Sequence, residues 1–600
     1  MRLDEFYSGR SFDSYTWLGA HTDSTGTMFR VFAPHADSVS VIGSFNDWND
    51  AQMSRIGDGS FWALYVSNAK AGDMYKYRIY HNGTATEHSD PYAFGMQLRP
   101  ESASVIRDIR YDFDDFPWMN GRGVWHGDAL NIYEVHLGSW KENPDDPNGW
   151  YDYSELAPKL ISYCKEHGYN CIELMPLNEY PCDNSWGYQA TGFFAPTARY
   201  GEAKQLKQFV EQCHKHSIAV IMDFVPVHFA VDGYALANFD GTPLFESEYD
   251  DISYSEWGSR NFDFSKGYVR SFLNSAANYW LTEYHFDGLR MDAISRVIYW
   301  MGEPQRGVNE NGLEFLKNMN AGLKWIHPSA ILCAEDSTDY PNVTRSVAEG
   351  GLGFDYKWDM GWMNDTLDYF IKNPEERVPH YHKLTFSMLY NYSEKYILPL
   401  SHDENVHGKA TIMQKMNGGY DDKFPQARAL YMYMYAHPGK KLNFMGSEFG
   451  QLREWDETRE QDWDMLKYPI HDAFSAFMKK LCKLYLKKPV LSRWDDTPDG
   501  FAWLDCDSAL RRCYTMIRRC DGEKPIVIVM NFSDSVQEHY SFNIGAGKKL
   551  TILLDSTADE FNGCLPHYKK TLKADQNGNV TMNVPRYSAA YYTLADITVS

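Results

Sequence analysis

The sequence lacks the features that mark membrane, secreted and metal-finger proteins. No apolar run approaches the roughly 20 residues needed to span a bilayer. The first residues, Met-Arg-Leu-Asp-Glu-Phe-Tyr, include no apolar segment of the kind found in signal peptides. None of the ten cysteines forms a C-x-x-C pair or a metal-finger spacing. We therefore expect a cytoplasmic protein with reduced thiols and no membrane association.

Positive charge is also scarce, and the common cofactor motifs are missing. The chain has 58 Lys and Arg residues against 81 Asp and Glu residues, which gives a net charge of -23. This balance argues against nucleic acid or an anionic membrane as a partner, but not against a neutral substrate. No HExxH motif, P-loop or dinucleotide-binding glycine motif in a strand–helix context is present. We expect no cofactor and no metal.

The chain is too long for one core, because 600 residues predict several domains. A hydrophobic fraction of 44% allows sizeable cores, and 16% aromatic residues is a high share. Short strands separated by Gly, Asn and Asp turns predict an N-terminal β-sandwich over residues 1–112. Five further strand-like runs predict a C-terminal all-β domain over residues 491–600.

Between them, residues 113–490 alternate strand-like and helical runs. Helices are predicted at 154–167, 202–216, 267–284 and 312–326, and a last one at 472–487. The eight expected strands are 129–136, 170–176, 219–224, 288–293, 330–335, 354–356, 396–401 and 441–445. Eight such units in series favour a closed (β/α)8 barrel, with a doubly wound open sheet as the alternative. The long segment 229–265 is predicted to be a functional loop.

The run Gly288-Leu289-Arg290-Met291-Asp292-Ala293 predicts a short strand with one charged face. Side chains two residues apart on a strand point the same way, so Arg290 and Asp292 should project together. A guanidinium beside a carboxylate lowers the carboxylate pKa, which would keep Asp292 ionised and available as a nucleophile. A purely structural ion pair is the alternative for this pair alone.

Polar clusters follow four of the predicted barrel strands. They are Asp223-Phe224-Val225-Pro226-Val227-His228, Arg290-Met291-Asp292, Ala334-Glu335-Asp336 and Ser401-His402-Asp403-Glu404. Catalytic groups of such barrels lie at the C-terminal ends of the strands. Carboxylates gathered in one site push their pKa values apart, which separates an acid from a nucleophile. Glycoside chemistry needs such a pair.

These four segments resemble the four signature regions of the α-amylase clan of glycoside hydrolases, in the same order. The resemblance implies that Asp292 is the nucleophile and Glu335 the general acid and base. It implies that Asp403 stabilises the oxocarbenium-like transition state. Arg290 would keep Asp292 ionised, with Asp223 bracing the arginine.

The same resemblance implies roles for three further side chains. His228 and His402 would hydrogen-bond the sugar in the cleaved subsite, and Tyr188 would stack under it. Val227 occupies the place of an asparagine that binds calcium in calcium-dependent amylases, so no calcium is expected there.

Within this clan the flanking residues resemble the glycogen branching enzymes, over almost the whole chain from about residue 15. The matching segments are 133–140 (YEVHLGSW), 186–189 (WGYQ), 195–197 (APT), 354–362 (FDYKWDMGW) and 402–404 (HDE). The turn Phe45-Asn46-Asp47-Trp48-Asn49 resembles the sandwich that precedes the barrel in glycogen-active enzymes. Glu404 favours branching, whereas Asp336 and Asn405 depart mildly from the family pattern.

The resemblance implies that the protein cuts an α-1,4 link and passes the chain to a 6-hydroxyl, forming α-1,6 branches in glycogen. Such transfer requires aromatic surfaces for a glucan, and we expect Trp186 and Trp362 near the cleft. We expect a monomer whose partner is an α-1,4-glucan. The alternatives are an α-glucan hydrolase or debranching enzyme of the same clan, and a non-catalytic glucan-binding protein.

Overall fold

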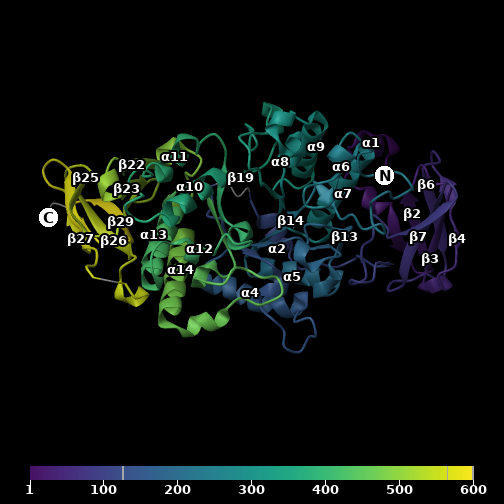
Figure 1. Cartoon of the computed structure of the whole chain (residues 1–600), viewed down its shortest axis with the longest axis horizontal. Coiled ribbons are helices and arrows are strands. Elements are labelled where there is room, and N and C mark those ends of the chain that lie inside the picture. Colours follow the sequence, from purple (N-terminus) through teal and green to yellow (C-terminus); the bar gives the residue numbers. More distant parts are fainter. Residues whose placement is uncertain (124–126, 564, 598–600) are drawn as a thin grey trace. The chain divides into compact units, whose positions relative to one another are not determined.

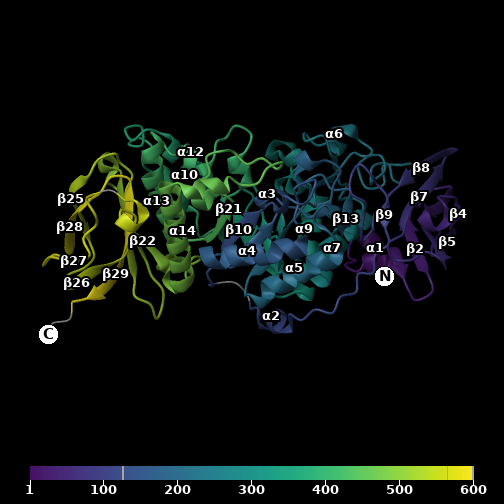
Figure 2. The same cartoon turned by 90° about the horizontal axis from the view of Figure 1, so that it is seen from below.

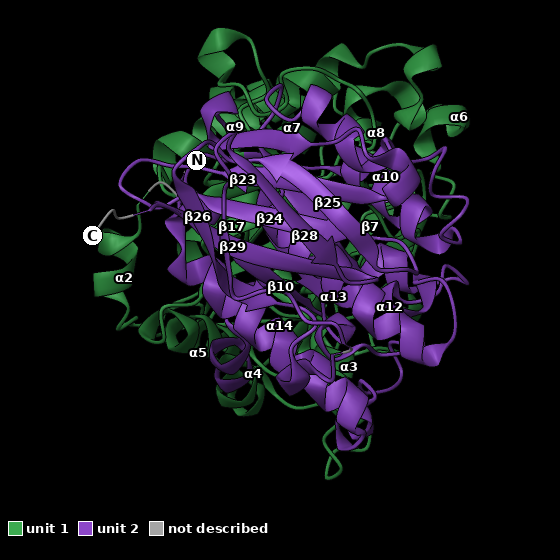
Figure 3. Ribbon diagram, turned by 90° about the vertical axis from the view of Figure 1, so that its left-hand side faces the viewer, with its two compact units in different colours: residues 1–124, 136–161, 173–355 green, residues 125–135, 162–172, 356–600 purple. Residues whose placement is uncertain are grey.

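The computed structural model describes residues 1–123, 127–563 and 565–597. The chain divides into two compact units, which Figure 3 colours separately. Unit 1 comprises residues 1–124, 136–161 and 173–355, and unit 2 comprises residues 125–135, 162–172 and 356–600. The limits of the three predicted domains stay a prediction.

Two antiparallel sheets form the N-terminal part of unit 1 (purple in Figure 1). One has the strand order β1-β2-β6-β5 and the other β4-β3-β7-β8, with β9 paired to β7. The strands are β1 Gly19–Thr22, β2 Thr27–Phe32, β3 Ser38–Gly43, β4 Ala51–Gln52, β5 Ser54–Ile56, β6 Phe61–Val66, β7 Met74–His81, β8 Thr84–His88 and β9 Ser104–Val105. Phe29 and Tyr75, from different sheets, are in ring contact at 5.0 Å. The predicted two-sheet arrangement is confirmed.

The central strands form a closed barrel in the order β10-β11-β14-β17-β18-β19-β20-β21. Their bounds are β10 Asn131–Val135, β11 Cys171–Leu174, β14 Ala219–Phe224, β17 Gly288–Met291, β18 Ile331–Ala334, β19 Tyr356–Trp358, β20 Tyr396–Leu400 and β21 Lys440–Phe444. Nearly every residue of these strands is buried, which is typical of parallel strands covered on both faces. The predicted closed barrel is confirmed, and an open sheet is excluded.

Helices follow most of the barrel strands, as the sequence predicts. They are α4 Tyr153–His167, α5 Ala203–Lys215, α7 Gly267–Glu283, α9 Glu310–Ile326, α10 Met360–Ile371 and α13 Tyr420–Ala436, and α14 Pro469–Lys487 precedes the C-terminal domain. The start of α9 lies two residues before the predicted one, because the side chain of Asn309 accepts a hydrogen bond from the Gly312 N–H at 3.2 Å. This capping bond sets the first turn of the helix.

One barrel strand is displaced from its predicted position. A strand was expected at residues 354–356, but β19 runs over Tyr356–Trp358. Asp355 forms the approach to the strand instead, and its carboxylate accepts hydrogen bonds from the Leu332 N–H at 2.9 Å and the Lys324 Nζ at 3.1 Å. A side chain that binds the backbone in this way competes with regular strand pairing.

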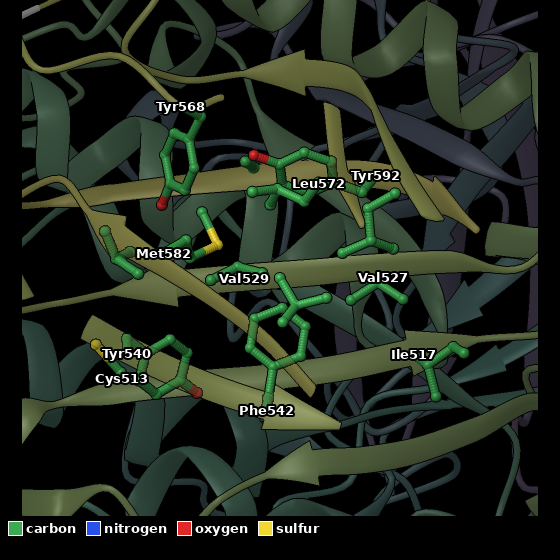
Figure 4. Close-up of a cluster of buried hydrophobic side chains, with 14 residues drawn as sticks. Cys513, Ile517, Val527, Val529, Tyr540, Phe542, Tyr568, Leu572, Met582 and Tyr592 are labelled. Atoms are coloured by element: carbon green, nitrogen blue, oxygen red, sulfur yellow. The ribbon is translucent and has the colours of Figure 1, made fainter. Parts of the chain in front are cut away.

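The C-terminal domain is all-β, as predicted (yellow in Figure 2). A six-stranded sheet has the order β22-β23-β24-β29-β26-β27, and β25 and β28 form a second sheet. The strands are β22 Phe501–Asp505, β23 Cys513–Arg518, β24 Ile526–Asn531, β25 Gln537–Asn543, β26 Lys548–Asp555, β27 Thr571–Lys573, β28 Asn579–Val584 and β29 Ser588–Asp596. Figure 4 shows their shared core, in which Val527 and Val529 of one sheet pack with Tyr540, Phe542 and Met582 of the other.

The thiols match the sequence expectation within the described part of the chain. The nine cysteines there form no disulfide with one another and most are buried, whereas Cys564 lies outside the described residues. No helix of the described residues has both the length and the apolar character needed to cross a membrane.

Within unit 1, a buried charged network fastens the segment that precedes the barrel to α5 and to the residue before β17. His214 on α5 lies between two carboxylates, with Nδ1 2.8 Å from Asp115 Oδ2 and Nε2 3.0 Å from Asp287 Oδ2. Because carboxylates only accept, both ring nitrogens donate and the ring is protonated. Burial opposes this charge, but Asp287 and Asp115 raise the pKa of His214 above its ordinary value. Arg122 adds a second cation, 2.7 Å from Asp287 Oδ1.

We expect His214→Gln to lower the midpoint of thermal unfolding. Removing one partner of a buried ion pair costs about 3–5 kcal/mol, because the remaining charges stay buried. Since the folded pKa of His214 is raised, its stabilisation is fully present below about pH 6.5 and is lost as the pH rises through the folded value. The difference from the unsubstituted protein should therefore shrink at alkaline pH, measured by circular dichroism.

The matched control is His216→Gln, because His216 is exposed and its ring bonds the Gln212 carbonyl, at 2.9 Å, and no carboxylate among the described residues. Equal unfolding midpoints for the two variants at about pH 6 would contradict a stabilising role for the network.

Candidate active site

The candidate site of unit 1 is built around the buried guanidinium of Arg290. Strands β14 and β17 pair in parallel with Asp223 opposite Arg290, which places both side chains at the same height. Arg290 Nη1 lies 2.7 Å from both oxygens of Asp223 and 2.8 Å from Asp292 Oδ1. Neither Arg290 nor Asp223 is more than 1% exposed. The predicted contact between Arg290 and Asp292 is therefore present, and Asp223 braces the arginine.

Glu335 reaches the same guanidinium from the next strand. β17 and β18 pair with Met291 opposite Ala334, so Glu335 follows its strand where Asp292 follows the neighbouring one. Glu335 Oε2 lies 3.2 Å from Arg290 Nη2 and accepts a hydrogen bond from the Ala293 N–H at 2.7 Å. One arginine therefore binds both carboxylates that the sequence assigns to the chemistry.

The charge balance of this cluster leaves its carboxylates only partly neutralised. Burial alone would favour a neutral arginine, but Asp223, Tyr188, Asp292 and Glu335 raise the pKa of Arg290 well above its ordinary value. Asp223 is fully buried, whereas the Asp292 and Glu335 side chains are 14% and 15% exposed. The two carboxylates that can meet a substrate are thus the ones that remain open to solvent.

Tyr188 and His228 lie beside this cluster within unit 1. The Tyr188 hydroxyl donates a hydrogen bond to Asp223 Oδ2 at 2.6 Å. His228 begins β15 (His228–Phe229), is buried, and has no hydrogen-bond partner for Nδ1 among the described residues. Burial, assisted by Arg296, lowers the pKa of His228 to about 3, so the ring is neutral at neutral pH. A neutral imidazole can exchange hydrogen bonds with sugar hydroxyls without adding charge.

In unit 2, the side chains of the fourth cluster follow β20. His402 Nδ1 lies 2.5 Å from Glu134 Oε1, and its backbone N–H donates to Glu134 Oε2 at 2.9 Å. This bidentate contact fixes the direction of the ring. His402 Nε2 lies 3.6 Å from Asp403 Oδ1, and the Asp403 side chain is 42% exposed. Glu134 was given no role from the sequence, although it is an acidic residue near the end of the first predicted strand and lies in the matching segment 133–140.

The two tryptophans expected near the cleft have different environments. Trp186 is partly exposed and follows a short turn (Asp183–Ser185) with a φ of 55°. A bulky residue with positive φ is uncommon, and such strain concentrates at functional sites. Trp362 is 1% exposed, and its ring stacks on Tyr433 at 6.1 Å. The expectation of substrate contact at Trp362 is corrected accordingly, because its ring fills the core of unit 2.

No group of three or more His, Cys, Asp or Glu side chains suited to a metal ion is found in the described residues. Val227, at the place compared with a calcium ligand, is buried and apolar.

Three family models match the chain. Residues 17–93 match carbohydrate-binding module 48 (isoamylase N-terminal domain), residues 143–257 the alpha amylase catalytic domain, and residues 503–595 the alpha amylase C-terminal all-beta domain. Among solved structures, a putative alpha amylase from Salmonella typhimurium is similar in fold, with a TM-score of 0.73 and 18% identity over 97% of this chain and 100% of that one. A pullulanase from Bacillus acidopullulyticus is also similar in fold. Its TM-score is 0.72 and its sequence identity 18%, over 96% of this chain and 74% of that one.

Curated relatives are much closer in sequence. The 1,4-alpha-glucan branching enzymes GlgB of Bacillus cereus strains AH187 and B4264 are each 40% identical to this chain over 608 aligned residues. The alignments cover 98% of this chain and 94% of each relative. The chain therefore belongs to the 1,4-alpha-glucan branching enzyme family, within the larger group that shares the alpha amylase catalytic domain.

Proposed function

We propose that this protein cleaves an α-1,4 linkage in a linear glucan and transfers the released chain to a 6-hydroxyl, forming an α-1,6 branch. Relatives at 40% identity over nearly the whole chain carry this activity in their names. The observation that supports the chemistry is the shared contact of Asp292 and Glu335 with one buried arginine. We also propose a cytoplasmic location and a monomeric state.

In the first step, Asp292 attacks the anomeric carbon of the cleaved sugar. A bond forms between its carboxylate oxygen and C1 as the C1–O4 bond breaks, and Glu335 donates a proton to the departing O4. Arg290 keeps Asp292 ionised for this attack because their opposite charges are 2.8 Å apart. The hydrogen bond from the Ala293 N–H holds Glu335 in place beside it.

In the second step, the 6-hydroxyl of an acceptor glucan attacks the same C1. Glu335, now a carboxylate, takes the hydroxyl proton, and the bond between C1 and Asp292 breaks. Two inversions give net retention, so the new linkage is again α. Retention predicts that the carboxyl groups of Asp292 and Glu335 lie roughly 5–5.5 Å apart when substrate is bound.

Asp403 is the third carboxylate of the proposal. It directly follows a parallel barrel strand, which is where barrels of this kind carry catalytic groups. We assign it to stabilise positive charge on the sugar ring in the transition state. His402 and His228 would bind hydroxyls of the cleaved sugar, Tyr188 would support its ring, and Trp186 would contact the glucan.

Incubation with linear amylose should lower the iodine colour without a matching release of reducing ends. New α-1,6 linkages should appear in the proton NMR spectrum, because the covalent intermediate is passed to a sugar hydroxyl. Reducing ends that rise in step with the loss of colour, without α-1,6 signals, would contradict transfer and favour hydrolysis.

Glu335→Gln should lower the branching rate on the order of 10²–10⁴-fold, because the amide cannot supply the proton for the leaving oxygen. Amylose binding, measured by calorimetry, should persist. The control Asp251→Asn, at an exposed position of α6 (Asp250–Ser253), should leave the rate unchanged. A Glu335→Gln protein with ordinary activity would remove Glu335 from the mechanism.

A further inference from the structure

The loop between β15 and α7 presents two exposed aromatic rings, each backed by an arginine. Trp257 is 46% exposed and Tyr254 is 44% exposed. The guanidinium carbon of Arg296 lies 4.3 Å from the centre of the Trp257 ring, and that of Arg260 lies 3.6 Å from the Tyr254 ring. A guanidinium at this distance stacks on one face of a ring. One face of each ring is therefore covered by its arginine.

A hydrogen-bonded turn holds Trp257 at its tip. The Ser255 N–H donates to the Ser259 carbonyl at 2.9 Å, and the Trp257 N–H donates to Ser255 Oγ at 3.2 Å. Gly258 closes the turn with a φ of 76°. The Trp257 carbonyl accepts a hydrogen bond from Gln189 Nε2 at 2.9 Å. The ring is thus oriented before any ligand binds, which reduces the entropic cost of binding.

Tyr254 is anchored to the hairpin that carries His228. Tyr254 and Arg260 form a β-bridge, and Arg260 begins β16 (Arg260–Asn261). β16 pairs antiparallel with β15, with His228 opposite Asn261. Arg260 Nη1 also donates to Ser253 Oγ at 2.8 Å. The support of the second ring is therefore continuous with the strand β15, which begins at His228 of the candidate site.

The Trp257 ring also connects directly to residues of the candidate site. It lies 5.2 Å from the ring of His228, whose Nδ1 has no partner among the described residues. Arg296 belongs to α8 (Ser295–Ile298), and its backbone N–H donates a hydrogen bond to the Ala293 carbonyl at 3.0 Å. The same Ala293 binds Glu335 through its own N–H. The backbone of Ala293 thus supports both Glu335 and the arginine that stacks on Trp257.

We propose that Trp257 and Tyr254 form a glucan-binding track, in which each ring stacks on the C–H face of a glucose unit next to the cleaved linkage. This proposal rests on the proposed function, which supplies the neutral polyhydroxy chain as ligand. The charge of the surface fits such a ligand, because Arg296 is ion-paired with Glu256 and offers no free cation for an anion. Flat, rigid rings in a neutralised setting suit the apolar faces of a sugar.

Trp257→Ala should raise KM for amylose at least about 5-fold, as expected when a rigid aromatic contact is removed from a binding surface. The Trp257→Phe variant, which keeps a ring, should recover most of this loss. Tyr254→Ala should raise KM independently. Calorimetric titration of maltoheptaose into Glu335→Gln proteins, with and without Trp257→Ala, should show the same weakening without turnover.

The control is Trp325→Ala, because Trp325 on α9 is 86% exposed and lies outside this loop. It should leave KM unchanged, and thermal unfolding of every variant should match that of the unsubstituted protein. A KM and a maltoheptaose affinity within twofold of the unsubstituted values in both alanine variants would overturn the track. Absence of α-1,6 products from the unsubstituted protein would instead overturn the proposed function, and maltoheptaose titration would still test the track.

Discussion

The buried guanidinium of Arg290 is the constraint on which the candidate site depends. A cation with no exposed surface is costly unless negative charges surround it, and here three carboxylates contact it. Asp223 is buried with the arginine, while Asp292 and Glu335 each meet it from one side and keep part of their surface open. One arginine thus contacts two carboxylates that follow neighbouring strands, and the proposed two-step glycosyl transfer requires a pair of carboxylates.

The register of the barrel explains why so much of this site could be predicted. In a parallel barrel, the residues that follow each strand lie at the same rim. A polar cluster after an apolar run in the sequence therefore indicates a residue of a site at that rim. Asp223, Arg290, Asp292 and Glu335 could be expected at one rim for this reason, and the pairing of β14 with β17 and of β17 with β18 brings them together. The same periodicity predicted the eight strands, the helices α4, α5, α7, α9 and α14, and the two flanking β regions, but it gave no bounds for α10 and α13.

Contacts that depend on tertiary packing could not be predicted. Trp362 is the last residue of the matching segment 354–362, yet its ring is buried against Tyr433 because α10 packs that face inward. Glu134 gave no signal as the partner of His402, since 268 residues separate them. The predicted position of β19 was two residues too early, because the side chain of Asp355 binds the backbone of a neighbouring strand. Each case is a long-range contact that local patterns do not encode.

The central claim is that Asp292, held ionised by Arg290, forms a covalent bond to the transferred sugar. The most direct test is to trap that intermediate with a fluorinated maltosyl fluoride, which forms the glycosyl–enzyme quickly and loses it slowly. Mass spectrometry of the digested protein should then find one added fluorinated maltosyl group, with the fluoride leaving group lost, on the peptide that contains Asp292. A label on Glu335 or Asp403, or no label in a protein that the reagent inactivates, would contradict the account.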